Sequence, residues 1–200
     1  MSTWISKAVL ASFLLSGCVV SDIGTGLTSN DNGGGQGEPP ASIILAGLKV
    51  TGPSGFCPVQ DSRQRVGEAE FAALAPCSGM PGPILATTIG EAGSSEGISL
   101  AASVLRPYFE TVEGQSALRG AGNRDLISVH EVTDVSGAVV LRLTRESNGR
   151  SGDSWRALMQ IDGRLITLSV RPRHGEAMSI TEGQRLIGRF VRAMRGANLP

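Results

Sequence analysis

The segment from Leu126 to Val170 constrains the fold more than any other part of the chain, because apolar and polar residues alternate along it in successive runs. Alternation with a period of two is typical of β-strands with one buried face. Ser136-Gly137 is a turn signal after the first run, and Asp162-Gly163 is a strong hairpin signal before the last. We therefore expect a four-strand antiparallel meander whose apolar face another element must cover.

A helical pattern from Ile180 to Arg195 can provide that cover. Ser179 and Glu182 have the spacing of a capping box at its start, and Gly196 offers a C-cap at its end. Arginines occupy the side opposite an apolar stripe, which is typical of a helix lying on a core. The stripe consists of Leu186, Ile187, Phe190, Val191 and Met194.

The part of the chain before the meander has weaker patterns. Strands are expected over residues 42–51, 71–75 and 84–89, and a short helix or a loop over 61–69. Ile98 to Leu118 predicts a helix that Ser94 or Ser95 caps and that Pro107 kinks or splits. The order indicates an α+β fold: a mainly antiparallel sheet with a C-terminal four-strand meander, covered by a middle helix and a C-terminal amphipathic helix.

Residues 1–18 have the pattern of an export signal. Lys7 precedes an apolar run from Ala8 to Leu15, which is too short to cross a bilayer, since a spanning helix takes about 20 residues. Leu15-Ser16-Gly17-Cys18 resembles a bacterial lipobox. The resemblance implies cleavage before Cys18, acylation of its thiol and of the new N-terminus with fatty acids such as palmitate, and a stable membrane anchor.

The expected organisation follows from this signal. Residues 1–17 form a lipoprotein signal peptide, 18–40 a lipidated cysteine with a flexible Gly-rich tether, and 41–200 a single globular α+β domain. Val19 stands where the enterobacterial pattern for inner-membrane retention has Asp. We therefore expect an anchored protein of the cell envelope that faces the periplasm, in the outer membrane rather than the inner.

The cysteine count fits that compartment. With Cys18 carrying lipid, Cys57 and Cys77 are left as a pair in an oxidising space, where a disulfide is expected. A redox pair or two metal ligands are the alternatives. A redox pair usually has the Cys-X-X-Cys spacing, and a metal site would need further His or Cys nearby.

Charge and histidine content limit the classes of partner. The chain has 18 basic and 18 acidic side chains, so it lacks the basic excess that nucleic-acid binding requires. His130 and His174 are the two histidines, and neither lies in a cluster of three or four ligands. We expect neither a metal nor another cofactor.

One motif points to catalysis. The segment Gly93-Ser94-Ser95-Glu96-Gly97 matches G-x-S-x-G, and Asp153 or Asp162 followed by His174 would complete the order Ser…Asp…His. A nucleophile elbow needs a sharp turn directly from a strand into a helix, in a parallel sheet. Because the strands here read as antiparallel, helix capping is the favoured role for Ser95, and no catalytic residue is assigned.

The order of elements is similar to that of the PsbP-like fold of photosystem accessory proteins and bacterial envelope lipoproteins. The shared features are the turn Gly52-Pro53-Ser54-Gly55-Phe56, the middle helix, the meander and the amphipathic end helix, over residues 42–196. The resemblance implies a non-enzymatic accessory or binding domain, and it transfers no site residues.

The sequence therefore predicts a lipid-anchored envelope protein with a non-catalytic binding or accessory domain. A small serine hydrolase using Ser95 and His174, and a purely structural envelope protein, are the alternatives. Beyond the membrane itself, the expected partner is an envelope protein or an anionic lipid. Its binding face would comprise Arg185, Arg189, Arg192, Arg171 and Arg173. A solvated helix face without function is the other explanation of these arginines.

Overall fold

The computed structural model describes residues 41–119, 125–147, 150–173 and 176–199. Contacts divide the chain into Met1–Gly37 and Glu38–Pro200, and all described residues belong to the second unit. The predicted signal peptide, Cys18, the predicted tether to residue 40 and His174 lie outside the described residues. No helix in the described part of the chain is long and apolar enough to cross a membrane.

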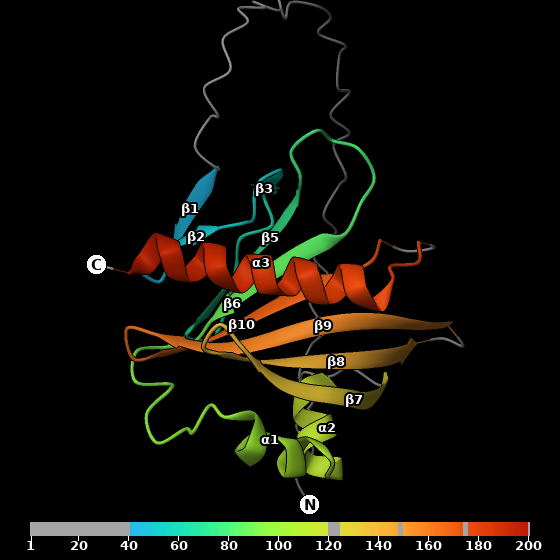
Figure 1. Ribbon diagram of the computed structural model, residues 1–200. Helices are drawn as coiled ribbons and strands as arrows, with labels where there is room; N and C mark the ends of the chain where they lie inside the picture. Colours follow the sequence, from blue (N-terminus) through green and yellow to red (C-terminus); the bar gives the residue numbers. More distant parts are fainter. Residues whose placement is uncertain (1–40, 120–124, 148–149, 174–175, 200) are drawn as a thin grey trace, which may run out of the picture. The chain divides into compact units, whose positions relative to one another are not determined.

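An eight-stranded antiparallel sheet forms the centre of the described unit (Figure 1). Its order is β3-β5-β6-β10-β9-β8-β7, and β4 also pairs with β5. The strands are β3 (Phe56–Pro58), β4 (Gln64–Val66), β5 (Ala69–Pro76), β6 (Ile84–Ile89), β7 (Leu126–Val135), β8 (Ala138–Ser147), β9 (Arg150–Ile161) and β10 (Arg164–Arg171). The last four strands are the expected meander, so the α+β prediction is confirmed.

Both predicted tight turns of the meander are present. Ser136 and Gly137 have φ angles of 51° and 75°, and Asp162 and Gly163 have 51° and 67°. Two successive positive φ angles are what a two-residue type I′ hairpin needs. The next two strands of the meander are long, since β8 extends to Ser147 and β9 starts at Arg150.

The helix α3 (Ile180–Asn198) covers one face of the sheet, together with a separate hairpin of β1 (Ser42–Leu45) and β2 (Leu48–Thr51) (Figure 1). Ser179 caps the helix by accepting a hydrogen bond from the Glu182 amide. Gly196 does not end it, because Asn198 continues the helix and bonds to both backbone groups of Lys49 in β2.

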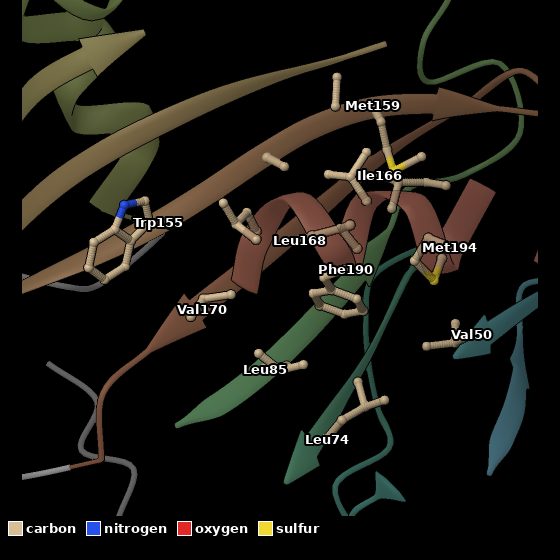
Figure 2. Close-up of a cluster of buried hydrophobic side chains, with 14 of the residues drawn as sticks. Val50, Leu74, Leu85, Trp155, Met159, Ile166, Leu168, Val170, Phe190 and Met194 are labelled. Carbon is tan, nitrogen blue, oxygen red and sulfur yellow. The ribbon is translucent and has the colours of Figure 1, made fainter. Parts of the chain in front are cut away.

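The larger buried cluster lies under α3. Phe190 points from the helix towards the side chains of β9, β10 and β6, and Trp155 lies at one end of the cluster (Figure 2). Phe190, Met194 and Trp155 are fully buried, as expected for the apolar stripe and the meander face. This face therefore holds most of the apolar area that stabilises the fold.

The other face of the sheet carries α1 (Ala102–Phe109) and α2 (Val112–Arg119), which pack on β7 (Figure 1). The expected single helix is split at Glu110–Thr111, not at Pro107, because the Thr111 hydroxyl accepts from the Gly114 amide and starts α2. Capping by Ser94 or Ser95 is also wrong. The Ala102 amide at the start of α1 donates instead to Asp134 Oδ1 in β7, at 3.0 Å.

Two expectations near the N-terminal side of the domain need correction. Residues 42–51 form the β1–β2 hairpin and not one strand, because Ala46 and Gly47 adopt φ angles of 48° and 84° and turn the chain back. Residues 61–69 contain the short strand β4. Both segments are short and lack a clear apolar period, which is why the pattern did not resolve them.

Candidate functional site

The two cysteines of the domain are bonded to each other. Cys57 in β3 and Cys77 directly after β5 form a disulfide with their Cα atoms 4.9 Å apart, inside the expected range of about 4.4–6.8 Å. Since β3 is the edge strand beside β5, the bond fastens the edge of the sheet.

The G-x-S-x-G segment does not have the geometry of a nucleophile elbow. Ser95 lies in a run of turns, its amide bonds to the Gly163 carbonyl at 3.3 Å, and α1 begins only at Ala102. The Ser95 hydroxyl is buried and has no hydrogen-bond partner among the described residues. The motif therefore packs against the β9–β10 turn and lacks the direct passage from strand to helix that a nucleophile elbow needs.

The five arginines expected to form one partner face lie in different places. Arg185, Arg189 and Arg192 are exposed on α3, and Arg173 is exposed after β10. Arg171 belongs to the opposite face of the sheet, because Val170 before it is buried under α3 and successive strand residues alternate. The alternation of β10 already contained this signal.

A polar cleft of about 290 Å³ opens beside the first turns of α3, on the same face of the sheet as that helix. Its volume is close to the lower limit for small-molecule sites. The lining residues are Glu131, Thr133, Val135, Val140, Arg142, Trp155 and Gln184.

Strand register places the charged and aromatic groups of the cleft in a row. Glu131 in β7 is opposite Arg142 in β8, which is opposite Trp155 in β9. A β-bulge between Val129 and Glu131 shifts the register of β7 just before this row. Gln184 of α3 donates to Glu131 Oε2 at 2.9 Å and so joins the helix to the row.

Arg142 lies between two carboxylates without a close bond to either. Its Nε is 3.9 Å from Glu131 Oε2, and its Nη1 is 3.8 Å from Asp153 Oδ2. The Arg142 Nε and the Trp155 Nε1 are both buried, and neither has a hydrogen-bond partner among the described residues. Buried N–H groups are rarely left unpaired, so these two donors of the cleft still lack an acceptor.

A hydrogen-bonded chain borders the cleft and bears on its chemistry. Thr144 Oγ1 donates to Asp153 Oδ1 at 2.8 Å and contacts His130 Nε2 at 2.7 Å. Because the threonine proton points to Asp153, His130 must donate to Thr144. A Ser-His-Asp triad instead places the histidine between hydroxyl and carboxylate, where it accepts the hydroxyl proton. This arrangement therefore orders Thr144 and does not activate it.

Sequence reasoning missed Glu131, Arg142, Trp155 and Gln184 as site residues. The alternation of β8 did place Arg142 on the face of Val140, but the cleft exists only where α3 begins above that face. No group of three or more His, Cys, Asp or Glu side chains suited to a metal ion occurs within the described ranges. No protein-family model matches the chain, and no curated protein matches it significantly.

Proposed function

We propose that this protein is a lipid-anchored protein of the bacterial cell envelope whose domain binds a small ligand without catalysing a reaction. The cleft beside α3 is the binding site. The observation that carries the proposal is the pair of buried, unpartnered donors in that cleft, Arg142 Nε and Trp155 Nε1. Leaving such groups unpaired costs about 1–3 kcal/mol each, and a ligand that accepts from them removes the cost.

The donors and acceptors of the cleft favour a small zwitterion. A carboxylate accepts from Arg142 and Trp155, while the Glu131 carboxylate, held by Gln184, receives an ammonium group. The volume of about 290 Å³ limits the ligand to roughly the size of a dipeptide.

The non-catalytic assignment has two supports. The Thr144 hydroxyl beside the cleft donates a hydrogen bond to Asp153, and the Ser95 hydroxyl is buried in a turn. An antiparallel sheet between helices also agrees with the resemblance to the PsbP-like fold, which favours an accessory or binding role. The lipobox resemblance at Cys18 supports an anchored domain that faces the periplasm, and Val19 in place of Asp favours the outer membrane over the inner.

Tryptophan fluorescence tests the binding proposal. Trp4 and Trp155 are the two tryptophans of the chain, so cleavage before Cys18 leaves Trp155 as the single reporter, inside the cleft. Titration of the processed protein with alanyl-alanine should change its emission in a saturable way. Arg142→Gln should weaken the binding at least tenfold, because it removes the charge that attracts the ligand carboxylate.

Arg189→Gln is the matched control, since it removes the same charge from the exposed side of α3 and should leave the titration unchanged. The dipeptide blocked at both ends by acetyl and amide groups should not bind. Equal binding of the blocked and free dipeptides, or no saturable change with either, contradicts the proposal.

A separate experiment tests the anchor. The intact mass of the protein from membranes should include acyl chains on Cys18, and Cys18→Ser should leave the chain unprocessed or release it from the membrane fraction. A wild-type protein without acyl mass contradicts the localisation but not the binding site.

A further inference from the structure

Three arginines gather on the face of the sheet opposite α3, at the end of α2. Arg145 in β8 is opposite Gly152, and Arg156 in β9 is opposite Leu141 and Ser169. Arg171 in β10 follows Ser169 by two residues and therefore has its side chain on the same face. Figure 1 shows α2 on this side of β7 and β8, which agrees with the bond from Arg156 Nη1 to the Leu118 carbonyl at 2.9 Å.

The residues between these arginines are small. Gly152 and Ser154 of β9 occupy the strand positions that separate Arg156 from Arg145. A Cβ atom added to Gly152 would meet nothing within 4 Å, so the space beside Arg145 is open. The three arginines thus flank small residues, and the space above Gly152 is open.

The positive charge there exceeds its compensation. Arg145 Nη1 pairs with Asp125 Oδ2 at 2.6 Å, which balances one of the three charges. The Arg145 Nε is buried and has no hydrogen-bond partner within the described ranges. Arg156 has the partial negative end of α2 as a neighbour, through Leu118, which stabilises a cation only in part.

The pKa shifts of Arg156 and Arg171 agree with an excess of positive charge. Burial, and after it the charges of Arg171 and Arg145, lower the pKa of Arg156 to about 10. Burial and Arg145 also lower the pKa of Arg171, against a smaller opposing effect of Asp125. Because guanidinium groups are charged at neutral pH, like charges are held together here at a free-energy cost that a bound anion offsets.

We propose that Arg145, Arg156 and Arg171 form a binding site for a phosphate-type oxyanion, either inorganic phosphate or the phosphate of an ester. Guanidinium groups present paired N–H donors that match the oxygens of phosphate. A dianion balances the two charges left after Asp125 is counted. The site is on the other face of the sheet from the ligand cleft, so either can exist without the other.

Thermal unfolding of the full chain in detergent tests the site. Sodium phosphate should raise the Tm in a saturable way, and sodium chloride of equal ionic strength should not. Arg171→Gln should abolish the rise, because it removes one of the three charges. The variant should still fold, since the Arg171 side chain makes no hydrogen bond to the described residues. The control Arg192→Gln removes an equal charge from the exposed side of α3 and should keep the rise.

Gly152→Asp is a second test, because its expected effect is a higher Tm, which a variant that fails to fold cannot give. The new carboxylate lies next to Arg145 in open space, so it should raise the Tm without phosphate and remove most of the phosphate-dependent rise. No phosphate-dependent rise in the wild type, or equal losses in Arg171→Gln and Arg192→Gln, overturns the proposal.

Vesicles distinguish the two sources of phosphate. The Cys18→Ser chain, which lacks the anchoring thiol, is mixed with phosphatidylcholine vesicles with or without phosphatidic acid. Binding to phosphatidic acid that Arg171→Gln abolishes identifies a lipid headgroup as a ligand. A phosphate-dependent Tm rise without vesicle binding identifies a soluble phosphate, and a response to neither overturns the site.

Discussion

The two faces of the central sheet are covered in different ways. On one face, α3 and the β1–β2 hairpin bury a large apolar cluster that includes Trp155 and Phe190. On the other, α1 and α2 bury a smaller cluster over β7 and β8, around Phe109 and Leu141. Beyond these two helices, that second face carries Arg145, Arg156, Arg171 and small residues.

The two faces therefore contribute differently to the stability of the fold and to the charged groups that could bind a ligand. The α3 face contributes most of the apolar burial, which is the main favourable term in folding. The α1–α2 face tolerates charged groups because its cover is partial and a part of its side chains stays hydrated. Both proposed sites lie at the limits of a buried cluster, where polar groups are held in place but not fully enclosed.

The largest expected effect comes from breaking the α3 face. Phe190→Ala should lower the free energy of unfolding by about 3–5 kcal/mol, because the ring is fully buried and its removal leaves a cavity. Urea unfolding of the full chain measures this loss. Arg189→Ala, one residue earlier but exposed, should change the stability by less than about 1 kcal/mol. Equal losses in the two variants would show that α3 is not the core element.

The same change on the other face should cost less. Phe109→Ala should lower the free energy of unfolding by about 2–3 kcal/mol, because the cluster under α1 is small and α1 can move inwards to fill the space. Urea unfolding again gives the value, with exposed Tyr108→Ala in the same helix as the control. A loss as large as that of Phe190→Ala would contradict the difference between the two faces.

The contrast also explains what could be predicted from the sequence. The meander and α3 follow from strict alternation, two-residue turns and a capped apolar stripe, which are all local signals. The hairpin at Ala46-Gly47 was missed because a non-glycine residue takes the first positive φ. The start of α1 was missed because its cap, Asp134, is 32 residues away in the chain.

The sites were harder to predict for the same reason. The disulfide of Cys57 and Cys77 follows from counting, but the cleft needs Glu131, Arg142 and Gln184 to meet from three elements. The alternation of β10 could have separated Arg171 from the arginines of α3. Its approach to Arg145 and Arg156 depends on the order of the strands, which no local pattern contains.

A charged contact also helps to hold the α3 face together. The buried Glu70 accepts from the Ala46 amide in the β1–β2 turn and pairs with Arg63 and Arg65. The hydrogen bond from Arg65 is the main cause that lowers the pKa of Glu70 to about 2, against the opposing effect of burial. Since the pKa is lower in the folded state, this contribution is complete above about pH 4.5 and is lost as the pH falls towards 2.

Glu70→Gln should therefore lower the free energy of unfolding at pH 7 by about 1–2 kcal/mol, since solvent screens the exposed arginines. The difference between wild type and variant should shrink as the pH is lowered from 4.5 to 2, as measured by urea unfolding across that range. The control Glu68→Gln, beside it in sequence, removes an equal charge from an exposed position and should change the free energy of unfolding at pH 7 by less than about 1 kcal/mol. A difference that stays constant with pH would mean that the charge of Glu70 is not what matters.

The smallest effects come from two glycines of α3 that differ in what lies beneath them. A Cβ atom on Gly183 would be 2.3 Å from ring carbons of the buried Trp155, whereas one on Gly188 would be 3.6 Å from its nearest neighbour, the Arg192 Nη1. Gly183→Ala should lower the free energy of unfolding by about 1–2 kcal/mol, because overpacking outweighs the gain in helix propensity. Gly188→Ala gains that propensity without a clash, so it should stabilise the fold by up to about 1 kcal/mol. Urea unfolding should give changes in the free energy of unfolding of opposite sign for the two variants, and only Gly183→Ala should shift the Trp155 emission. Both results would agree with a contact between the first turns of α3 and Trp155, where the ligand cleft begins. Two changes of the same sign would contradict that contact.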